Sequence, residues 1–261
     1  MPAPAKIVII GAGRVAWHLG KRLKSKGLPV AQVLSRTDEH AESLAQTLQA
    51  RWSADWSEVL PQADWVLLAV RDDSIAEVAS RIAPHVPDAL VTHTSGGTPG
   101  TVLKPHFKRF GVFYPLQSFS FERSPVWSKI PFCVDAEREE DILFLKRIAK
   151  TIGNLVYRVN DEQRAALHVG AVFANNFANH CFAVAEKLLH EKSLAFEMLH
   201  PLMEETLAKA LLDSPARMQT GPALRGDVDT IRRHLELLND HPRWKELYAK
   251  MSASINPDME I

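Results

Sequence analysis

The sequence predicts an α/β fold: a doubly wound, mostly parallel Rossmann sheet followed by an all-α C-terminal domain. Over residues 1–160, short apolar runs alternate with helical patterns, as in parallel α/β sheets. A glycine-rich turn joins the first run to the first helix, and from residue 161 onward only helical periodicity is present. We therefore expect a dinucleotide-binding domain at residues 1–160 and a helical substrate and dimerisation domain at 161–261.

The first strand and helix enclose the turn GAGRVA. Residues 7–10 read IVII, which is typical of a strand buried on both faces, and a helical pattern follows at once. Gly11 would allow the tight turn, Gly13 would let the backbone approach a pyrophosphate, and Ala16 would let helix and strand pack closely. The free N–H groups at the helix N-terminus attract phosphate. A strand–helix turn without a ligand is the alternative. The predicted phosphate-binding residues are Gly11, Gly13, Arg14 and Val15.

The end of the second strand indicates which dinucleotide is bound. An NAD site would usually carry Asp or Glu about twenty residues after the turn. After the strand at 30–34 this chain instead has Ser35, Arg36 and Thr37. A guanidinium and two hydroxyls suit a 2′-phosphate, whereas a carboxylate would repel it. The sequence therefore favours NADP. In the alternative reading, Thr37 only caps the next helix and Arg36 is a solvated charge.

The remaining elements of the first domain place candidate residues along one edge of the sheet. The carboxyl ends of parallel strands line the ligand crevice of such folds. We expect Ala69, Val70, Arg71 and Ser95 beside the cofactor, and Gln117 and Ser118 at the substrate, with ordinary loop chemistry as the alternative. Further strands are predicted near 51–53 and at 65–70, 90–94, 111–114, 132–134 and 155–159, and helices at 41–48, 75–82 and 142–152.

A long helix is predicted from about residue 161 to 191. At about 100° per residue, His168, Asn175 and Asn179 fall within roughly 40° of one another on an otherwise apolar helix. Such a polar stripe needs partners, which could be a ligand, a second subunit or water. We expect His168 to donate a proton, Asn175 to orient a carbonyl or carboxylate, and Asn179 to contact substrate. A core histidine with structural asparagines is the alternative.

The same helix suggests a homodimer. Residues 165–185 contain no Asp, Glu, Lys or Arg, but the Asn and His residues there argue against a membrane span. A helix apolar all round must be buried on every side, and the domain has few other helices to cover it. Further helices are predicted at 195–212, 228–238 and 242–253, with a loop around Gly221–Pro222.

The loop before residue 228 reads GPALRGD. We expect Asp227 to cap the following helix. Arg225 could contact an acidic substrate or pair with a carboxylate, and the sequence leaves both open. The two cysteines, Cys133 and Cys181, form no CxxC pair, and no spacing of His, Cys, Asp and Glu predicts a metal site.

Composition limits the possible partners. Acidic and basic residues balance at 31 each, so no overall field would attract nucleic acid or an anionic membrane. The sheet pattern begins by Lys6, which leaves no room for a signal peptide in this sequence. With only two cysteines, these features predict a cytoplasmic protein.

Four motifs together resemble one bacterial family: HTSGG at 93–97, YPLQSFS at 114–120, HVGAVFANNFANH at 168–180 and TGPALRGDVDTIRRHL at 220–235. These are uncharacterised NADP oxidoreductases in which a Rossmann-like domain precedes a helical domain of unknown function. The family is related to pyrroline-5-carboxylate reductase and deazaflavin-dependent NADP oxidoreductase. The resemblance implies NADP binding and a helical domain that dimerises. Related hydroxyacid dehydrogenases carry Lys where this chain has Ala171, which argues against their mechanism.

These observations predict an NADP-dependent oxidoreductase that moves hydride between nicotinamide and a small C=O or C=N substrate in an interdomain cleft. The alternative is an NADP-binding sensor or scaffold without turnover.

Overall fold

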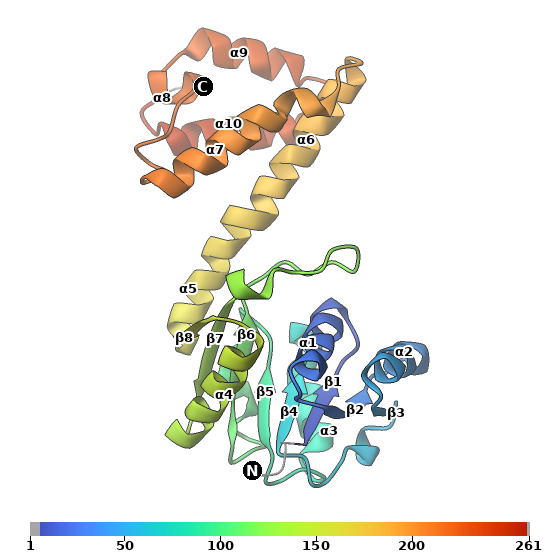
Figure 1. Ribbon diagram of the computed structural model, residues 1–261. Coiled ribbons are helices and arrows are strands. Elements are labelled where there is room, and N and C mark those ends of the chain that lie inside the picture. The colour runs from blue at the N-terminus through green and yellow to red at the C-terminus, as the bar shows by residue number, and fades with distance from the viewer. Residues whose placement is uncertain (1–5, 260–261) are drawn as a thin grey trace. The chain divides into compact units, whose positions relative to one another are not determined.

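The structure is a computed structural model that describes residues 6–259. Eight strands form one sheet in the order β3-β2-β1-β4-β5-β6-β7-β8 (Figure 1). The predicted Rossmann-like sheet is therefore confirmed, including the short strand at 51–53. The strands are β1 (Ile7–Ile10), β2 (Val30–Leu34), β3 (Arg51–Ser53), β4 (Trp65–Leu68), β5 (Leu90–His93), β6 (Phe110–Pro115), β7 (Pro131–Ala136) and β8 (Leu155–Arg158).

All neighbouring strands pair in parallel except β6 and β7, which are antiparallel with Tyr114 opposite Cys133. The strands β1, β2, β4, β5 and β6 consequently end at the same edge of the sheet, which we call the carboxyl edge. The loop of residues 116–130 leaves β6 at this edge and returns to it at the start of β7. Two cavities of the first 176 residues lie at this edge.

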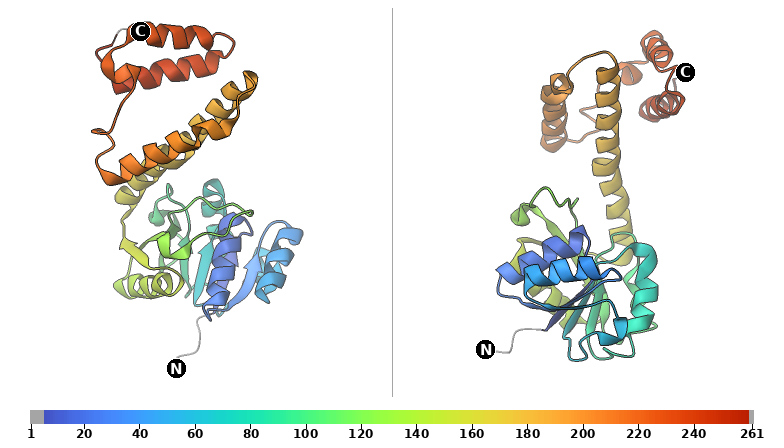
Figure 2. Two further views of the ribbon diagram at one scale, coloured as in Figure 1. Left: turned by 45° about the horizontal axis from the view of Figure 1, so that its top comes forward. Right: turned by 90° about the vertical axis from the view of Figure 1, so that its right-hand side faces the viewer.

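Helices cover both faces of the sheet. One face packs against α1 (Arg14–Ser25), α2 (Asp38–Leu48) and α4 (Glu139–Ile152), with Trp65 and Phe113 among its buried residues. The other face packs against α3 (Ile75–Ile82), which lies opposite α1 and α2 in the right-hand view of Figure 2. Every residue of β1 and β4 is buried, because parallel strands with helices on both sides have no solvent-facing side.

A long helical segment follows β8. It consists of α5 (Asp161–Ala171), a π-helical stretch (Val172–Phe177) and α6 (Ala178–Glu191), which confirms the helix predicted for 161–191. Asn160 begins it with a capping box, in which its side chain accepts from Gln163 N and the Gln163 side chain accepts from Asn160 N. Leu167 of α5 packs against the buried cluster of Val112, Tyr114 and Cys133 on β6 and β7.

The chain divides into two compact units, with the first ending at Asn176 and the second beginning at Phe177. The division thus falls inside the π-helical stretch. The sequence places the change from mixed to helical structure at residues 160 and 161, and the domain ranges 1–160 and 161–261 remain a prediction.

The second unit is helical. It contains α6, α7 (His200–Leu212), α8 (Pro222–Arg225), α9 (Val228–Leu237) and α10 (Pro242–Ile255). The single helix predicted for 195–212 is wrong at its start, where a 3-10 turn (Phe196–Leu199) precedes α7. Pro201 explains this, because a proline is tolerated only in the first helical turn.

The region around residues 221–227 differs in part from its prediction. The expected loop contains the short helix α8, which Pro222 begins after Gly221 at a positive φ of 112°. Asp227 caps α9 as predicted, since its side chain accepts from Thr230 N. Over residues 6–259, no helix is long and apolar enough to cross a membrane.

Candidate functional site

The glycine turn has the geometry that a phosphate-binding turn requires. Gly11 has a φ of 107°, and a Cβ there would lie 2.2 Å from the Ala69 carbonyl oxygen, so only glycine fits. A Cβ at Gly13 would meet nothing within 4 Å, so the backbone is open to approach at this position. Gly13 is the N-cap of α1, and neither a side-chain cap nor an acidic residue occupies the first turn. The N–H groups of this turn are therefore available to an anion.

A cavity of about 320 Å³ lies against this turn, and we call it the turn pocket. It is formed where β1, β2 and β4 end at the carboxyl edge. Of the predicted cofactor residues, eight line it and Arg14, Val15 and Ser95 do not. The eight are Gly11, Gly13, Ser35, Arg36, Thr37, Ala69, Val70 and Arg71; Ala12, His40, Trp56, Ser74 and Val78, which the sequence analysis did not single out, also line it.

The charges of the turn pocket favour an anion. Arg36 and Arg71 both line it, and Arg71 forms an ion pair with Asp73. Hydrogen bonds from Ser74 and Arg71 lower the pKa of Asp73 below its usual value. Thr37 is the N-cap of α2, but its hydroxyl makes no capping hydrogen bond. The arrangement supports the interpretation of Ser35, Arg36 and Thr37 as phosphate contacts.

The loop after β6 packs onto α1 next to the glycine turn. The His18 ring stacks on Phe119 with centroids 5.5 Å apart, and its Nε2 lies 2.8 Å from the Ser120 carbonyl oxygen. Phe121 meets Trp17 edge-on at 6.2 Å. The Arg14 guanidinium lies 5.9 Å from the centroid of the Phe121 ring. The loop that begins with Gln117 and Ser118 is thereby held against the first helix of the glycine turn.

A second cavity of about 540 Å³ lies between the end of β6 and α5, entirely within the first unit; we call it the helix pocket. Four predicted site residues line it: His168, Asn175, Gln117 and Ser118. Asn179 and Arg225 belong to the second unit and do not line this pocket. The remaining lining residues are Tyr114, Leu116, Leu167, Gly170, Ala171, Val172, Ala174 and Asn176.

Tyr114 and Asn176 also line this pocket, although the sequence analysis assigned no role to either side chain. Tyr114 stands in an apolar strand, and its partner His168 is 54 positions away, so no local pattern indicates the contact. Asn176 lies next to Asn175 in the π-helical stretch Val172–Phe177. A π-helix bonds each residue to the fifth rather than the fourth along, so the uniform 100° rotation assumed for the stripe does not hold there.

Tyr114 and His168 form the polar centre of the helix pocket. The Tyr114 Oη lies 3.3 Å from His168 Nδ1, and the rings are 6.1 Å apart at 73°. Burial is the main cause that raises the pKa of Tyr114 above its usual value, so the phenol is protonated at neutral pH. When the phenol donates to Nδ1, His168 carries its own proton on Nε2.

The loop after β5 supports this pair through Gly96. A Cβ at Gly96 would lie 2.5 Å from His168 Nδ1 and 2.7 Å from Tyr114 Cζ, so both rings rest directly on the glycine backbone. A Cβ at Gly97 would have its nearest neighbour, His168 Cδ2, at 3.6 Å. The HTSGG motif therefore contains one glycine that the contact requires and one that it does not.

Hydrogen bonds fix the conformation of the loop after β5. The Ser95 hydroxyl donates to Asp72 Oδ2 at 2.7 Å and accepts from Thr98 N at 2.9 Å. His93 Nδ1 accepts from Ser95 N at 3.2 Å. Burial, and next the positive charge of Arg164, lower the pKa of His93 to about 4. Ser95 thus supports the loop between the two pockets rather than lining either.

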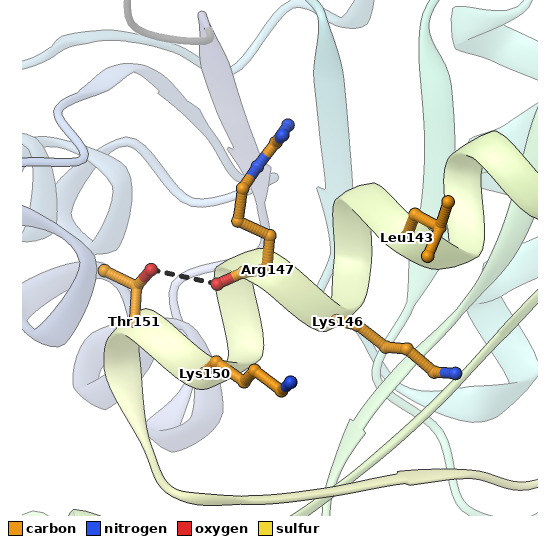
Figure 3. Close-up of a pocket in the computed structure, with 5 residues that line it drawn as sticks. All are labelled: Leu143, Lys146, Arg147, Lys150 and Thr151. Atoms are coloured by element: carbon orange, nitrogen blue, oxygen red, sulfur yellow. Dashed lines mark hydrogen bonds between the residues drawn. The ribbon is translucent and has the colours of Figure 1, made fainter.

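A third cavity, of about 370 Å³, lies on the outer face of α4 (Figure 3). Its lining residues are Leu143, Lys146, Arg147, Lys150 and Thr151, all from this helix. The Thr151 hydroxyl donates to the Arg147 carbonyl oxygen at 2.9 Å. A surface row of cations on one helix is ordinary solvated structure, and it contributes nothing to the two pockets at the carboxyl edge.

Comparisons with known proteins agree with this geometry. Residues 6–95 match the family model described as NADP oxidoreductase coenzyme F420-dependent, and residues 130–255 match a domain of unknown function, DUF2520. A putative NADP oxidoreductase from Bacteroides fragilis is 42% identical, with 97% of this chain and 98% of that chain covered and a TM-score of 0.91. The chain belongs to this family of NADP oxidoreductases. A comparison with curated proteins gives no match.

More distant structures share the fold of this NADP oxidoreductase family. A reductive aminase from Aspergillus terreus, in complex with NADPH and ethyl levulinate, is 14% identical with a TM-score of 0.72, over 98% of this chain and 93% of that chain. A pyrroline-5-carboxylate reductase from Coxiella burnetii is 17% identical with a TM-score of 0.60, over 97% and 96%. The predicted resemblance to the reductase is thereby confirmed for the fold. Within the described residues, no group of His, Cys, Asp and Glu could hold a metal ion.

The turn pocket predicts selectivity for NADPH over NADH. Arg36→Ala removes a guanidinium from the predicted 2′-phosphate contact. A charge-assisted contact is worth roughly 1.5–3 kcal/mol, so the wild type should prefer NADPH at least about tenfold and the variant should lose most of that preference. Calorimetric titration with both cofactors measures this. Arg81→Ala on α3, with the same charge change outside the pocket, should bind like the wild type. Equal wild-type affinities for the two cofactors would refute the interpretation.

The Gly96 contact predicts different effects for two adjacent substitutions. Gly96→Ala should destabilise the protein by about 1–3 kcal/mol and separate Tyr114 from His168, because overpacking forces the rings to move. Gly97→Ala should have little effect, since its Cβ meets only ordinary contacts. Urea unfolding and histidine NMR spectra of both variants measure the outcome. Equal stability and unchanged His168 signals in Gly96→Ala would show that the rings do not rest on this glycine.

Proposed function

We propose that the protein reduces a small neutral C=O or C=N compound with NADPH, and that the reaction takes place in the helix pocket. The observation that carries this proposal is the Tyr114–His168 pair, which lines a cavity of about 540 Å³. The helix pocket opens beside the last residues of β6. The ends of β1 and β2, in the same sheet, form the turn pocket. A polar pair in a mostly apolar pocket is the usual form of a small-molecule site.

The residues of the turn pocket fit the cofactor. The open approach at Gly13 and the uncapped first turn of α1 would hold the pyrophosphate, and Ser35, Arg36 and Thr37 would hold the 2′-phosphate. Val70 and Arg71 would lie along the dinucleotide. When bound, NADPH supplies the hydride, and the protein contributes position and electrostatics.

The Tyr114–His168 pair supplies the proton that balances the reduction. As the substrate carbon gains a hydride, its oxygen or nitrogen gains a proton, which we assign to His168 Nε2–H. The Tyr114 hydroxyl donates to Nδ1 and so keeps the proton on Nε2. As Nε2–H leaves, the Tyr114 proton passes to Nδ1, so His168 stays neutral. The phenolate left on Tyr114 is then reprotonated from solvent through the helix pocket, which both side chains line.

The polar groups around the pair indicate a neutral substrate. Gln117, Ser118, Asn175 and Asn176 can each donate and accept hydrogen bonds. The residues lining the helix pocket include no Lys, Arg, Asp or Glu. Ala171, which stands where related hydroxyacid dehydrogenases carry lysine, is one of them. We therefore propose that Asn175 orients a carbonyl or imine group. Substrate contacts by Asn179 and Arg225 remain predictions.

The proposal predicts a specific loss in His168→Ala. Removing a general acid typically lowers turnover by about 10²–10⁴, while NADPH affinity should stay unchanged because His168 does not line the turn pocket. Nicotinamide absorbance with a panel of small ketones, aldehydes and cyclic imines measures turnover, and calorimetry measures NADPH binding. His106→Ala, at a partly buried histidine that lines neither pocket, is the matched control. NADPH binding without turnover on any panel member would instead support a sensor or scaffold.

We also propose that the second unit forms a homodimer. Within one chain, α6 and α7 have no fully buried residue, although both are rich in apolar side chains. Leu202, Leu207, Leu211 and Leu212 of α7 are 61–83% exposed. Large exposed apolar side chains in this number mark an interface, and we propose that a second copy of the same helices covers them.

A charged residue on α7 should therefore weaken self-association. Light scattering of the wild type at micromolar concentration should give twice the 29.2 kDa chain mass. Leu211→Lys, at a position that is 79% exposed, should shift the protein toward monomer. Leu143→Lys on α4, at a position that is 59% exposed, should remain dimeric. A wild-type monomer would disprove the dimer.

A further inference from the structure

Arg164 is an arginine buried one helical turn before His168. Its side chain is 1% exposed, although it belongs to the polar first turns of α5. Its Nη2 donates to the Thr98 carbonyl oxygen at 2.5 Å and pairs with Asp161 Oδ1 at 2.8 Å. The same Asp161 oxygen accepts from Gly100 N at 2.9 Å. Arg164 and Asp161 thus attach the start of α5 to residues 98–100.

This attachment bears directly on the proposed active site. Residues 98–100 continue the loop that carries Gly96, on which the His168 and Tyr114 rings rest. The loop and His168 are therefore connected twice: through the ring contact with Gly96 and, one helical turn earlier, through the bond between Arg164 and Thr98. Two attachments a turn apart fix both the position of α5 along the loop and its rotation about its own axis.

Stability alone does not explain the burial of this arginine. Arg164 Nε and Nη1 are buried and have no hydrogen-bond partner, and an unsatisfied buried donor is unfavourable for folding. The ion pair is also asymmetric, because Asp161 is 34% exposed and keeps much of its hydration. Replacement of a whole buried ion pair by apolar groups of similar size is often neutral or stabilising, whereas removal of one partner alone is costly. The buried positive charge of Arg164 therefore needs an explanation other than stability.

The charge of Arg164 acts on two titratable groups near it, Tyr114 and His93. Its charge lowers the pKa of Tyr114, acting against burial and the groups of Cys133 and Asp72, which raise it. It also lowers the pKa of His93, as does burial, whereas Asp72 and Asp161 act in the opposite direction. A nearby cation makes a phenol a stronger donor, because it stabilises negative charge on the oxygen.

We propose that Arg164 is a positioning residue for the Tyr114–His168 pair: through Thr98 it holds the Gly96 loop against His168, and its charge makes the Tyr114 hydroxyl the donor to Nδ1. His168 is thereby kept with its proton on Nε2, the atom to which we assign proton transfer. The role of this proton rests on the proposed function, whereas the attachment and the charge effect do not.

The test uses the full chain without substrate. Arg164→Met removes the charge and keeps the bulk, and Arg164→Lys keeps the charge. The ultraviolet titration of Tyr114, obtained by subtracting the Tyr114→Phe titration, gives its midpoint. ¹⁵N NMR of the histidines gives the His93 midpoint and the His168 tautomer. A thermal melt gives stability.

In Arg164→Met we expect both midpoints to move to higher pH and the His168 signal to lose its Nε2–H character. The melting temperature should also fall, because the Thr98 carbonyl and Asp161 lose their partner. Arg164→Lys should restore the Tyr114 midpoint. If the methionine variant does not fold, Arg164→Gln, which is neutral but can still donate to Thr98, takes its place with the same expected shifts.

Unchanged Tyr114 and His168 signals in the neutral variant would overturn the proposal and leave Arg164 a structural residue. A lysine variant that behaves like the neutral one would overturn the charge effect. Because none of these readouts requires turnover, they remain decisive if His168→Ala proves fully active. In that case the proposed proton transfer is wrong. The Tyr114 and His93 titrations of the Arg164 variants still decide whether Arg164 positions the Tyr114–His168 pair.

Discussion

The candidate site depends on one close contact, in which the backbone at Gly96 lies directly beneath the rings of Tyr114 and His168. A single additional carbon at this position would come within 2.7 Å of both rings. Three separate parts of the chain must meet for the contact to exist: the loop after β5, the end of β6 and the middle of α5. Each is held by other interactions, namely the Ser95–Asp72 bond, the pairing of β6 with β7 and the Arg164–Thr98 bond.

The sheet topology explains why both pockets occur at one edge. Parallel strands bring the turns after β1, β2 and β4 together as the turn pocket, and β6 ends at the same edge beside the helix pocket. The antiparallel return of β7 sends the loop of residues 116–130 back across this edge, where Phe119 and Phe121 pack on α1. The loop that supplies Gln117 and Ser118 is therefore anchored on the helix that begins at the glycine turn.

Local pattern was sufficient to predict the sheet, most helices and the glycine turn, because continuous apolar runs and glycine positions are local consequences of burial and backbone geometry. It also selected His168 and Asn175, which line the helix pocket. The contacts of Tyr114, Gly96 and Arg164 could not be found in this way. These residues form contacts between segments that are distant in the sequence. Arg164 also lies in a charged stretch that is typical of a solvent-exposed helix N-terminus. The π-helical stretch has no local sequence signal, so the uniform helical rotation assumed there was wrong.

The most direct test of the account is a crystal structure of the NADPH complex. We expect the pyrophosphate at the first turn of α1 and the 2′-phosphate at Ser35, Arg36 and Thr37. The nicotinamide ring should lie at the helix pocket, with His168 Nε2 facing the space above it. A nicotinamide ring far from the Tyr114–His168 pair, or a His168 whose two ring nitrogens are both bonded within the protein, would contradict it.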